Sequence, residues 1–145
     1  MPERETIERA REDAKEGKSP STQAGEFVRE EFEHIREGKH GARSPQQAVA
    51  IGLSKARRAG VKLNSPKGPA SVRKKAQQDT RAGQHENKKK SAKRSQATSR
   101  ALKRESRSSG SRKAVSQQAK RAAARRSPAS RSAAAKKAAQ TRKAA

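Results

Sequence analysis

One stretch decides the fold, Ser44–Gly60, which reads SPQQAVAIGLSKARRAG. A start signal, an apolar run, a basic end and a stop signal follow one another in it. Ser44 suits the N-cap position of a helix, Pro45 suits the first turn, and Gln47 can complete a capping box. Gly60 supplies the left-handed residue that commonly ends a helix. The stretch therefore predicts one well-bounded helix.

The apolar side chains of this helix need a partner surface, and the preceding segment offers one. Both segments carry a row of apolar residues at helical spacing. The rows are Val28, Phe32 and Ile35 in the first segment and Val49, Leu53 and Ala56 in the second. About six residues connect the two segments, which is typical of an antiparallel helical hairpin. We therefore expect an all-α fold centred on this hairpin.

The chain divides into three regions by composition. We expect a small helical domain over residues 1–63, with helices at about 3–16, 20–37 and 45–59, then a Pro/Gly linker over 64–70 and a basic low-complexity arm over 71–145. The first helix is polar nearly all round, so we expect it to be loosely docked or frayed. About ten large apolar side chains are a marginal core for an independent domain. A homodimer formed through the hairpin would enlarge that core.

The N-terminal part of the chain and the rest differ in their net charge. The net charge is +24, but residues 1–40 hold 11 acidic and 8 basic side chains, whereas residues 41–145 hold 30 basic and 3 acidic ones. Hydrophobic residues make up 28% and charged residues 36% of the chain. Such an arm cannot bury enough apolar surface to offset the entropy of ordering it. We expect it to be disordered alone and partly helical on nucleic acid.

An arm this basic predicts an anionic partner, and DNA is the first expectation. Contacts of Lys and Arg with phosphates release counterions and are largely blind to base sequence. The arm has no aromatic side chain to stack on bases, so we expect non-specific binding to duplex DNA. The candidate nucleic-acid-binding residues are Lys55, Arg57, Arg58, Lys62, Arg73, Lys74, Lys75, Lys88, Lys89, Lys90, Lys93, Arg94, Arg100, Lys103, Arg104, Arg112, Lys113, Lys120, Arg121, Arg125, Arg126, Lys136, Lys137, Arg142 and Lys143.

Two alternatives stay open at this point. The first is a basic protein that associates with RNA or the ribosome, against which the missing aromatic residues count. The second is a stress-response module that binds another protein through the acidic face of the N-terminal hairpin. Salt dependence of binding to DNA and to RNA separates them, because only phosphate contacts release counterions.

Other classes of function are disfavoured by the residues present. The chain has no cysteine, and it has no nucleophile–base arrangement or Gly-rich phosphate loop, so we expect neither an enzyme nor a bound cofactor. His34 and His40 bracket the hairpin turn with Glu33 and Glu37 nearby, too few convergent ligands to predict a metal site.

The expected location is the cytoplasm, at the nucleoid. No secretory signal is expected, because the first residues are acidic and contain no apolar segment. No membrane span or membrane partner is expected, because the arm lacks an apolar face that could enter a bilayer.

Residues 24–63 resemble a family of small basic bacterial proteins that are described as DNA-binding. The likeness rests on Ala24–Glu31 (AGEFVREE), on Gly38–Gly41 (GKHG) and on the stretch quoted first, which is similar to the family's QAIAIGLSKARRAG helix. The arm is similar in composition to bacterial histone-H1-like proteins. The resemblance implies a bacterial DNA-binding protein with a helical hairpin, and it carries over no site residue beyond the basic end at Lys55, Arg57, Arg58 and Lys62.

Overall fold

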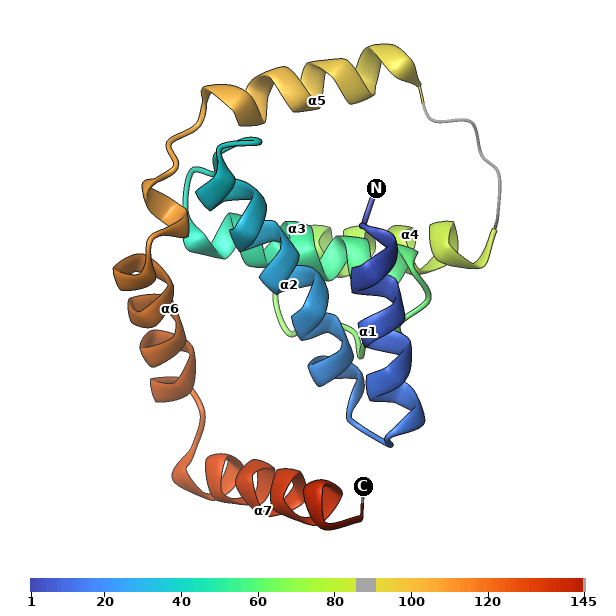
Figure 1. Cartoon of the computed structure of the whole chain (residues 1–145), viewed down its shortest axis with the longest axis vertical. Coiled ribbons are helices and arrows are strands. Elements are labelled where there is room, and N and C mark those ends of the chain that lie inside the picture. The colour runs from blue at the N-terminus through green and yellow to red at the C-terminus, as the bar shows by residue number, and fades with distance from the viewer. Residues whose placement is uncertain (86–90, 145) are drawn as a thin grey trace.

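The computed structural model describes residues 1–85 and 91–144, and every regular element in that part is helical (Figure 1). The elements are α1 (Arg4–Lys15), α2 (Pro20–Glu37), α3 (Pro45–Arg58), α4 (Ala70–Gln84), α5 (Ala92–Arg104), the short 3₁₀ helix η1 (Ser108–Gly110), α6 (Arg112–Ala124) and α7 (Pro128–Ala144). The expectation of an all-α fold is confirmed.

The hairpin helices begin and end at local signals. The Ser19 and Ser44 hydroxyls accept hydrogen bonds from backbone N–H groups in the first turns of α2 and α3. Gln47 reaches back one residue further than a capping box requires, because its Oε1 accepts from Arg43 N at 2.7 Å. Gly38 ends α2 with a φ of 78°, a left-handed conformation that favours glycine.

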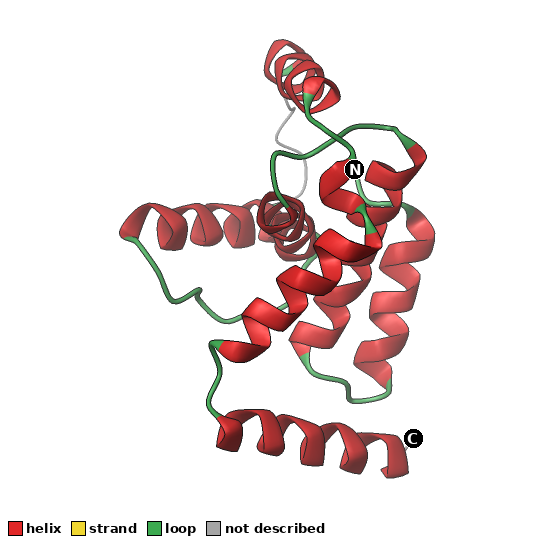
Figure 2. Ribbon diagram, turned by 90° about the vertical axis from the view of Figure 1, so that its left-hand side faces the viewer, coloured by secondary structure: helices red, strands yellow, loops and turns green. Residues whose placement is uncertain are grey.

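Helix α2 is the centre of the packed region, with α1 and α3 against it and α4 against α3 (Figures 1 and 2). Two apolar clusters fill the interfaces. The first contains Ala10, Ala24, Phe27 and Ala56, with Ile7, Leu53, Val61 and Leu63 packed against it. The second contains Phe32, Ile35, Ala42 and Ala48, with Val28, Val49 and Val115 packed against it. The two apolar rows of the hairpin therefore do face one another.

Helices α2 and α3 approach closely because of one glycine. A Cβ at Gly52 would lie 2.7 Å from the backbone Cα of Val28. Only a residue without a side chain allows this separation, since backbone atoms cannot rotate away as a flexible side chain could.

Helix α1 is firmly docked, so the expectation of a loose or frayed first helix is wrong. Thr6 and Ala10 are buried, and Arg9 Nε donates to Glu26 Oε2 of α2 at 2.7 Å. The docking is therefore polar as well as apolar. A count of apolar side chains alone therefore underestimates how firmly α1 is attached to α2.

Packing continues beyond the 64–70 segment, because α4 is attached to α3 through a buried carboxylate. Asp79 is 2% exposed and accepts hydrogen bonds from Ser54 Oγ at 2.7 Å, Arg58 Nε at 2.8 Å and Lys75 Nζ at 3.1 Å. Burial favours a higher pKa for Asp79, but these hydrogen bonds outweigh it and hold the pKa below its usual value of 3.8.

The segment between α5 and α6 is attached to the hairpin turn. Gly41 N donates to the carbonyl of Leu102 at 2.9 Å, and Ala42 N donates to that of Ser106 at 3.1 Å. The guanidinium of Arg107 donates to carbonyl oxygens at the C-terminus of α2. The two Arg107 bonds go to the carbonyls of Ile35, which also accepts from Gly38 N, and of Arg36. We call residues 102–110 the docking segment.

The expectation that residues 71–145 are disordered is not borne out, because helices α4 to α7 cover most of that region. Its Ala, Gln, Lys and Arg residues have high helix propensity. Ser91, Ser111 and Ser127 each accept a hydrogen bond from the backbone N–H three residues on, at 3.4, 3.2 and 3.1 Å. These caps and propensities outweigh the repulsion between like charges that favoured disorder.

Candidate nucleic-acid interface

Helices α5, α6 and α7 project their basic side chains into solvent. Helices α5 and α7 stand apart from the other helices in both views (Figures 1 and 2). The exposed members of the predicted set are Arg58, Lys62, Arg73, Lys74, Lys75, Lys93, Arg94, Arg100, Lys103, Arg104, Arg112, Lys113, Lys120, Arg121, Arg125, Arg126, Lys136, Lys137, Arg142 and Lys143. Predicted residues Lys88, Lys89 and Lys90 lie outside the described residues.

Three of the five basic residues of α5 share one face. Lys93, Arg100 and Arg104 are spaced at i, i+7 and i+11, which places them along one face of a helix with 3.6 residues per turn. In the next helix Lys113 and Lys120 share a face at i and i+7, and Arg112 and Arg121 lie to either side of it. Two consecutive helices thus present basic strips, a geometry that suits a line of phosphates.

Few acidic groups offset this charge in the described part of the chain beyond Leu63. Asp79 of α4 is buried against α3 and paired with Arg58 and Lys75. Glu105 lies 3.8 Å from Arg43. Because these two carboxylates cancel so few of the positive charges, the arm keeps a strong positive field, which attracts a polyanion.

Two of the predicted residues lie inside the protein and leave the candidate interface. Arg57 is 9% exposed and donates to the carbonyl of Asn64 at 3.1 Å. The Lys55 side chain is 19% exposed, and its ammonium lies 3.0 Å from Glu30 Oε1 and 2.8 Å from Glu31 Oε2. Lys55 and Arg57 therefore stabilise the fold, and Arg58 and Lys62 are the exposed residues at this end of α3.

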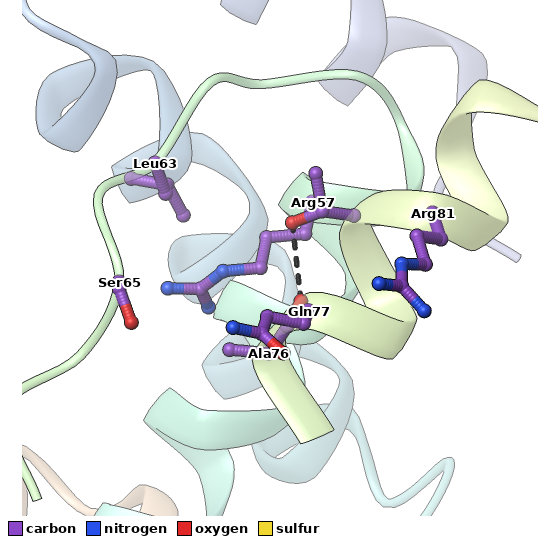
Figure 3. Close-up of a pocket in the computed structure, with 7 residues that line it drawn as sticks. Arg57, Leu63, Ser65, Ala76, Gln77 and Arg81 are labelled. Atoms are coloured by element: carbon purple, nitrogen blue, oxygen red, sulfur yellow. Dashed lines mark hydrogen bonds between the residues drawn. The ribbon is translucent and has the colours of Figure 1, made fainter. Parts of the chain in front are cut away.

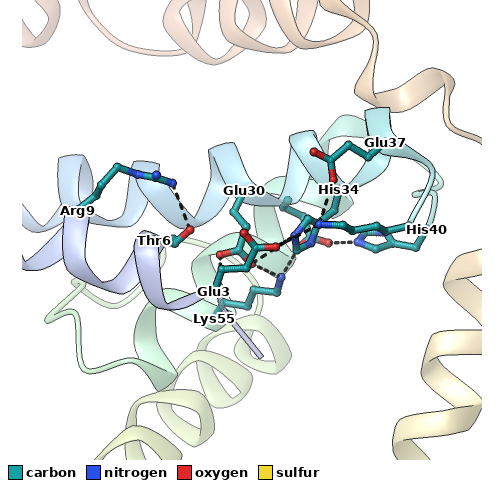
Figure 4. Close-up of polar contacts among 10 residues, drawn as sticks. Glu3, Thr6, Arg9, Glu30, His34, Glu37, His40 and Lys55 are labelled. Carbon is teal, nitrogen blue, oxygen red and sulfur yellow. Dashed lines mark hydrogen bonds and ion pairs between the residues drawn. The ribbon is translucent and has the colours of Figure 1, made fainter.

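Lys55 belongs to a cluster of charged side chains between α1, α2 and α3 (Figure 4). We call Glu3, Glu30, Glu31, His34, His40 and Lys55 the buried charge cluster. Burial opposes ionisation of Glu30 and Lys55, but hydrogen bonds and the opposite charges prevail. The pKa of Glu30 is therefore lowered and that of Lys55 raised, so both groups stay charged at neutral pH.

Two histidines close the buried charge cluster at the C-terminal end of α2. His34 Nε2 lies 2.9 Å from Glu3 Oε1, and His40 Nε2 lies 3.1 Å from Glu31 Oε1. The two rings meet edge to face with centroids 6.1 Å apart. The sequence placed Glu33 and Glu37 near these histidines but missed Glu31. The spacing of Glu31 and His34 at i and i+3 is the signal that could have identified it.

A shallow pocket of about 230 Å³ lies between α3, α4 and the loop that joins them (Figure 3). Its lining residues are Arg57, Leu63, Ser65, Ala76, Gln77, Thr80 and Arg81. These residues include no carboxylate and no histidine, so the pocket holds no acid–base pair for catalysis. Thr80 Oγ1 donates to the carbonyl of Ala76, within its own helix.

The chain matches no protein-family model, no curated protein and no solved structure. The family resemblance of residues 24–63 therefore stays a prediction. None of the helices in residues 1–85 and 91–144 has the length and apolar content needed to cross a membrane.

Proposed function

We propose that this protein binds duplex DNA without sequence specificity, through contacts of its basic helices with backbone phosphates, and that it acts as a histone-like component of the bacterial nucleoid. The observation that carries the proposal is the pair of exposed basic strips on α5 and α6, in an arm whose described carboxylates are already paired. The resemblance of the hairpin to proteins described as DNA-binding favours the same function.

The arm is attached to the helical hairpin at defined contacts. The docking segment joins the end of α5 to the turn after α2 through the bonds of Gly41 and Ala42. Val115 of α6 packs against the second apolar cluster. Because part of the arm is already ordered, binding costs less conformational entropy than folding the whole arm on DNA.

RNA is the less favoured partner. The aromatic side chains of the chain are those of Phe27 and Phe32, and both are buried in the core. No Phe, Tyr or Trp ring is therefore exposed to stack on an unpaired base, as sequence-specific RNA recognition commonly requires.

A protein-binding acidic face on the hairpin is also less favoured. Glu30 and Glu31 are buried beside Lys55, while Glu26 and Glu33 pair with Arg9 and Arg29. These four carboxylates of the hairpin are thus paired with basic side chains of the same chain.

Mobility shifts with duplex DNA and structured RNA of equal length, across a salt series, test the proposal. With about 6–10 phosphate contacts, affinity for duplex DNA should fall by ~10³–10⁵ between about 50 and 200 mM salt. A flat salt dependence, or much tighter binding to RNA at every salt concentration, contradicts the proposal.

A triple variant on α5 tests the interface itself. Replacing Lys93, Arg100 and Arg104 with Gln should reduce the slope of log K against log salt by about 2–3, since each phosphate contact contributes about 0.9. The matched control removes the same charge from exposed positions on α1, by Arg4→Gln, Arg11→Gln and Lys15→Gln. Equal losses in the two variants would show that only net charge matters and would overturn the assignment to α5.

A further inference from the structure

We propose that Glu31, His34 and His40 form a binding site for a divalent transition-metal ion of the Zn²⁺ class. One ligand atom from each residue lies within 4.8 Å of the others. Glu31 is 1% exposed, and the side chains of His34 and His40 are 13% and 16% exposed. None of the three residues is a basic residue of α5 or α6, and the proposal does not rest on DNA binding.

The local fold brings the three residues together. Glu31 and His34 are separated by one turn of α2 and share a face. Gly38 adopts its left-handed conformation at the end of α2 and reverses the chain. The reversal carries the ring of His40, labelled in Figure 4, back to within 3.1 Å of Glu31 Oε1. A metal ion here would bridge the last turns of α2 and the loop that follows.

The hydrogen bond of the second ring nitrogen orients His40 as metal-binding histidines are oriented. His40 Nδ1 lies 3.0 Å from the carbonyl oxygen of Gly41, an acceptor, so Nδ1 carries the proton. In the neutral ring the lone pair of Nε2 then faces Glu31 Oε1 at 3.1 Å. Two acceptors at this distance need a cation or a proton between them, and a backbone carbonyl on the other nitrogen is a common outer-shell partner of a metal ligand.

The charge balance of the buried groups favours a cation at this point. Glu30 and Glu31 share the single ammonium of Lys55, which leaves one negative charge in excess when the histidines are neutral. Glu31 Oε2 is buried and receives no hydrogen bond, although Lys55 Nζ lies 2.8 Å away. Two buried carboxylates that share one ammonium are costly, and a metal ion would balance the second charge.

The types of ligand atom indicate which metal ion the site would bind. Two imidazole nitrogens and one carboxylate oxygen suit Zn²⁺, which binds both at about 2.0–2.2 Å. Tetrahedral coordination at these lengths separates ligand atoms by about 3.4 Å. The present separation of 3.1 Å between His40 Nε2 and Glu31 Oε1 is close to that value. Water, or Glu3 beside His34, is the remaining ligand.

Calorimetric titration of the chelator-treated full chain with Zn²⁺ tests the site. We expect one ion bound per chain. His40→Gln and His34→Gln should weaken binding by more than the ~10–100-fold that loss of an outer-shell partner costs. His85→Gln, at the exposed end of α4, is the matched control and should bind as the original chain does. No binding by the original chain, or undiminished binding by the double variant H34Q/H40Q, overturns the proposal.

A second measurement needs no variant, in case the substitutions unfold the hairpin. Zn²⁺ should shift the imidazole NMR signals of His34 and His40 at one equivalent and leave those of His85 unchanged. Shifts at His85 alone, or at no histidine, would equally overturn the proposal. The visible spectrum of bound Co²⁺ then reports whether coordination is tetrahedral.

Discussion

Gly110 lies so close to Ile35 that a Cβ on the glycine would approach Ile35 Cγ2 to 2.6 Å. This contact seats η1 on the end of α2, and Arg36 Nε donates to the carbonyl of Gly110 at 2.9 Å. The arm is therefore attached to the hairpin at a position that no larger residue can occupy without movement of the docking segment.

Gly110→Ala should loosen this attachment. The added methyl group meets a buried side chain, and overpacking of this kind costs about 1–3 kcal/mol. Limited proteolysis at the Lys and Arg residues of α5 and α6 should become faster. Gly25→Ala is the control, because no atom lies within 4 Å of a Cβ there and alanine is the better helix former. Equal proteolysis of both variants would contradict the tight contact.

Lys55→Met should destabilise the fold far more than it weakens DNA binding. It leaves Glu30 and Glu31 buried without their shared cation, and breaking a buried ion pair costs about 3–5 kcal/mol. Urea unfolding measures the loss. Lys62→Met, at an exposed position near the same end of α3, should change stability by less than about 0.5 kcal/mol. A mild effect of Lys55→Met would return this lysine to the candidate interface.

Stability should depend on pH through Asp79. Its pKa is lower in the folded protein than in the unfolded chain, so the ionised carboxylate stabilises the fold above about pH 4 and this contribution is lost as the pH falls through the folded-state pKa. Asp79→Asn should therefore lose less stability than the original chain when urea unfolding at pH 7 is compared with unfolding at pH 3.

The control for this comparison is Glu8→Gln, an exposed carboxylate on α1. It should show the same loss between pH 7 and pH 3 as the original chain. The assignment to Asp79 fails if Asp79→Asn and Glu8→Gln behave alike.

The helices of the arm should be present without DNA, and Ser111 tests this. Its hydroxyl accepts a hydrogen bond from Ala114 N at 3.2 Å at the start of α6. Ser111→Ala should cost about 0.5–2 kcal/mol of helix stability and reduce the far-ultraviolet circular dichroism of the free protein. Ser116→Ala, inside the same helix and exposed, should slightly increase that signal. An unchanged spectrum for Ser111→Ala would mean that α6 is not formed in the free protein.

The hairpin could be predicted because the residues that begin and end its helices lie next to those helices in the sequence. Ser44 and Pro45 begin α3, Gly38 ends α2, and the apolar rows at helical spacing identify the faces that pack. Helix boundaries at Glu37 and Arg58 follow from these signals to within about one residue.

The docking of α4 and of residues 102–110 could not be predicted in this way. Asp79 appears in the sequence as one acid among many bases, and only its burial shows that it joins α4 to α3. The docking segment is held by backbone carbonyls and by the absence of a side chain at Gly110, and neither leaves a periodic pattern. The spacing of hydrophobic residues therefore does not predict polar contacts between segments that are distant in the sequence.

Of the candidate sites too, one could be predicted from local periodicity and the others could not. The exposed strip at Lys93, Arg100 and Arg104 follows from helical periodicity once α5 is known to be a helix. The inward position of Lys55 and the approach of His40 to Glu31 depend on a turn geometry and a helix rotation that residue types alone do not determine.

The bond between Ala42 and Ser106 has a mechanical consequence. It joins the hairpin turn directly to the middle of the docking segment, so residues 42 and 106 close a loop of the chain that includes α3 and α4. Tension applied to α7 by a moving DNA segment would load the contacts of Val115, Gly110 and Arg107 first and this bond after them. Helix α4 would stay unstretched until they break, and their rupture would then lengthen the tether in a single step.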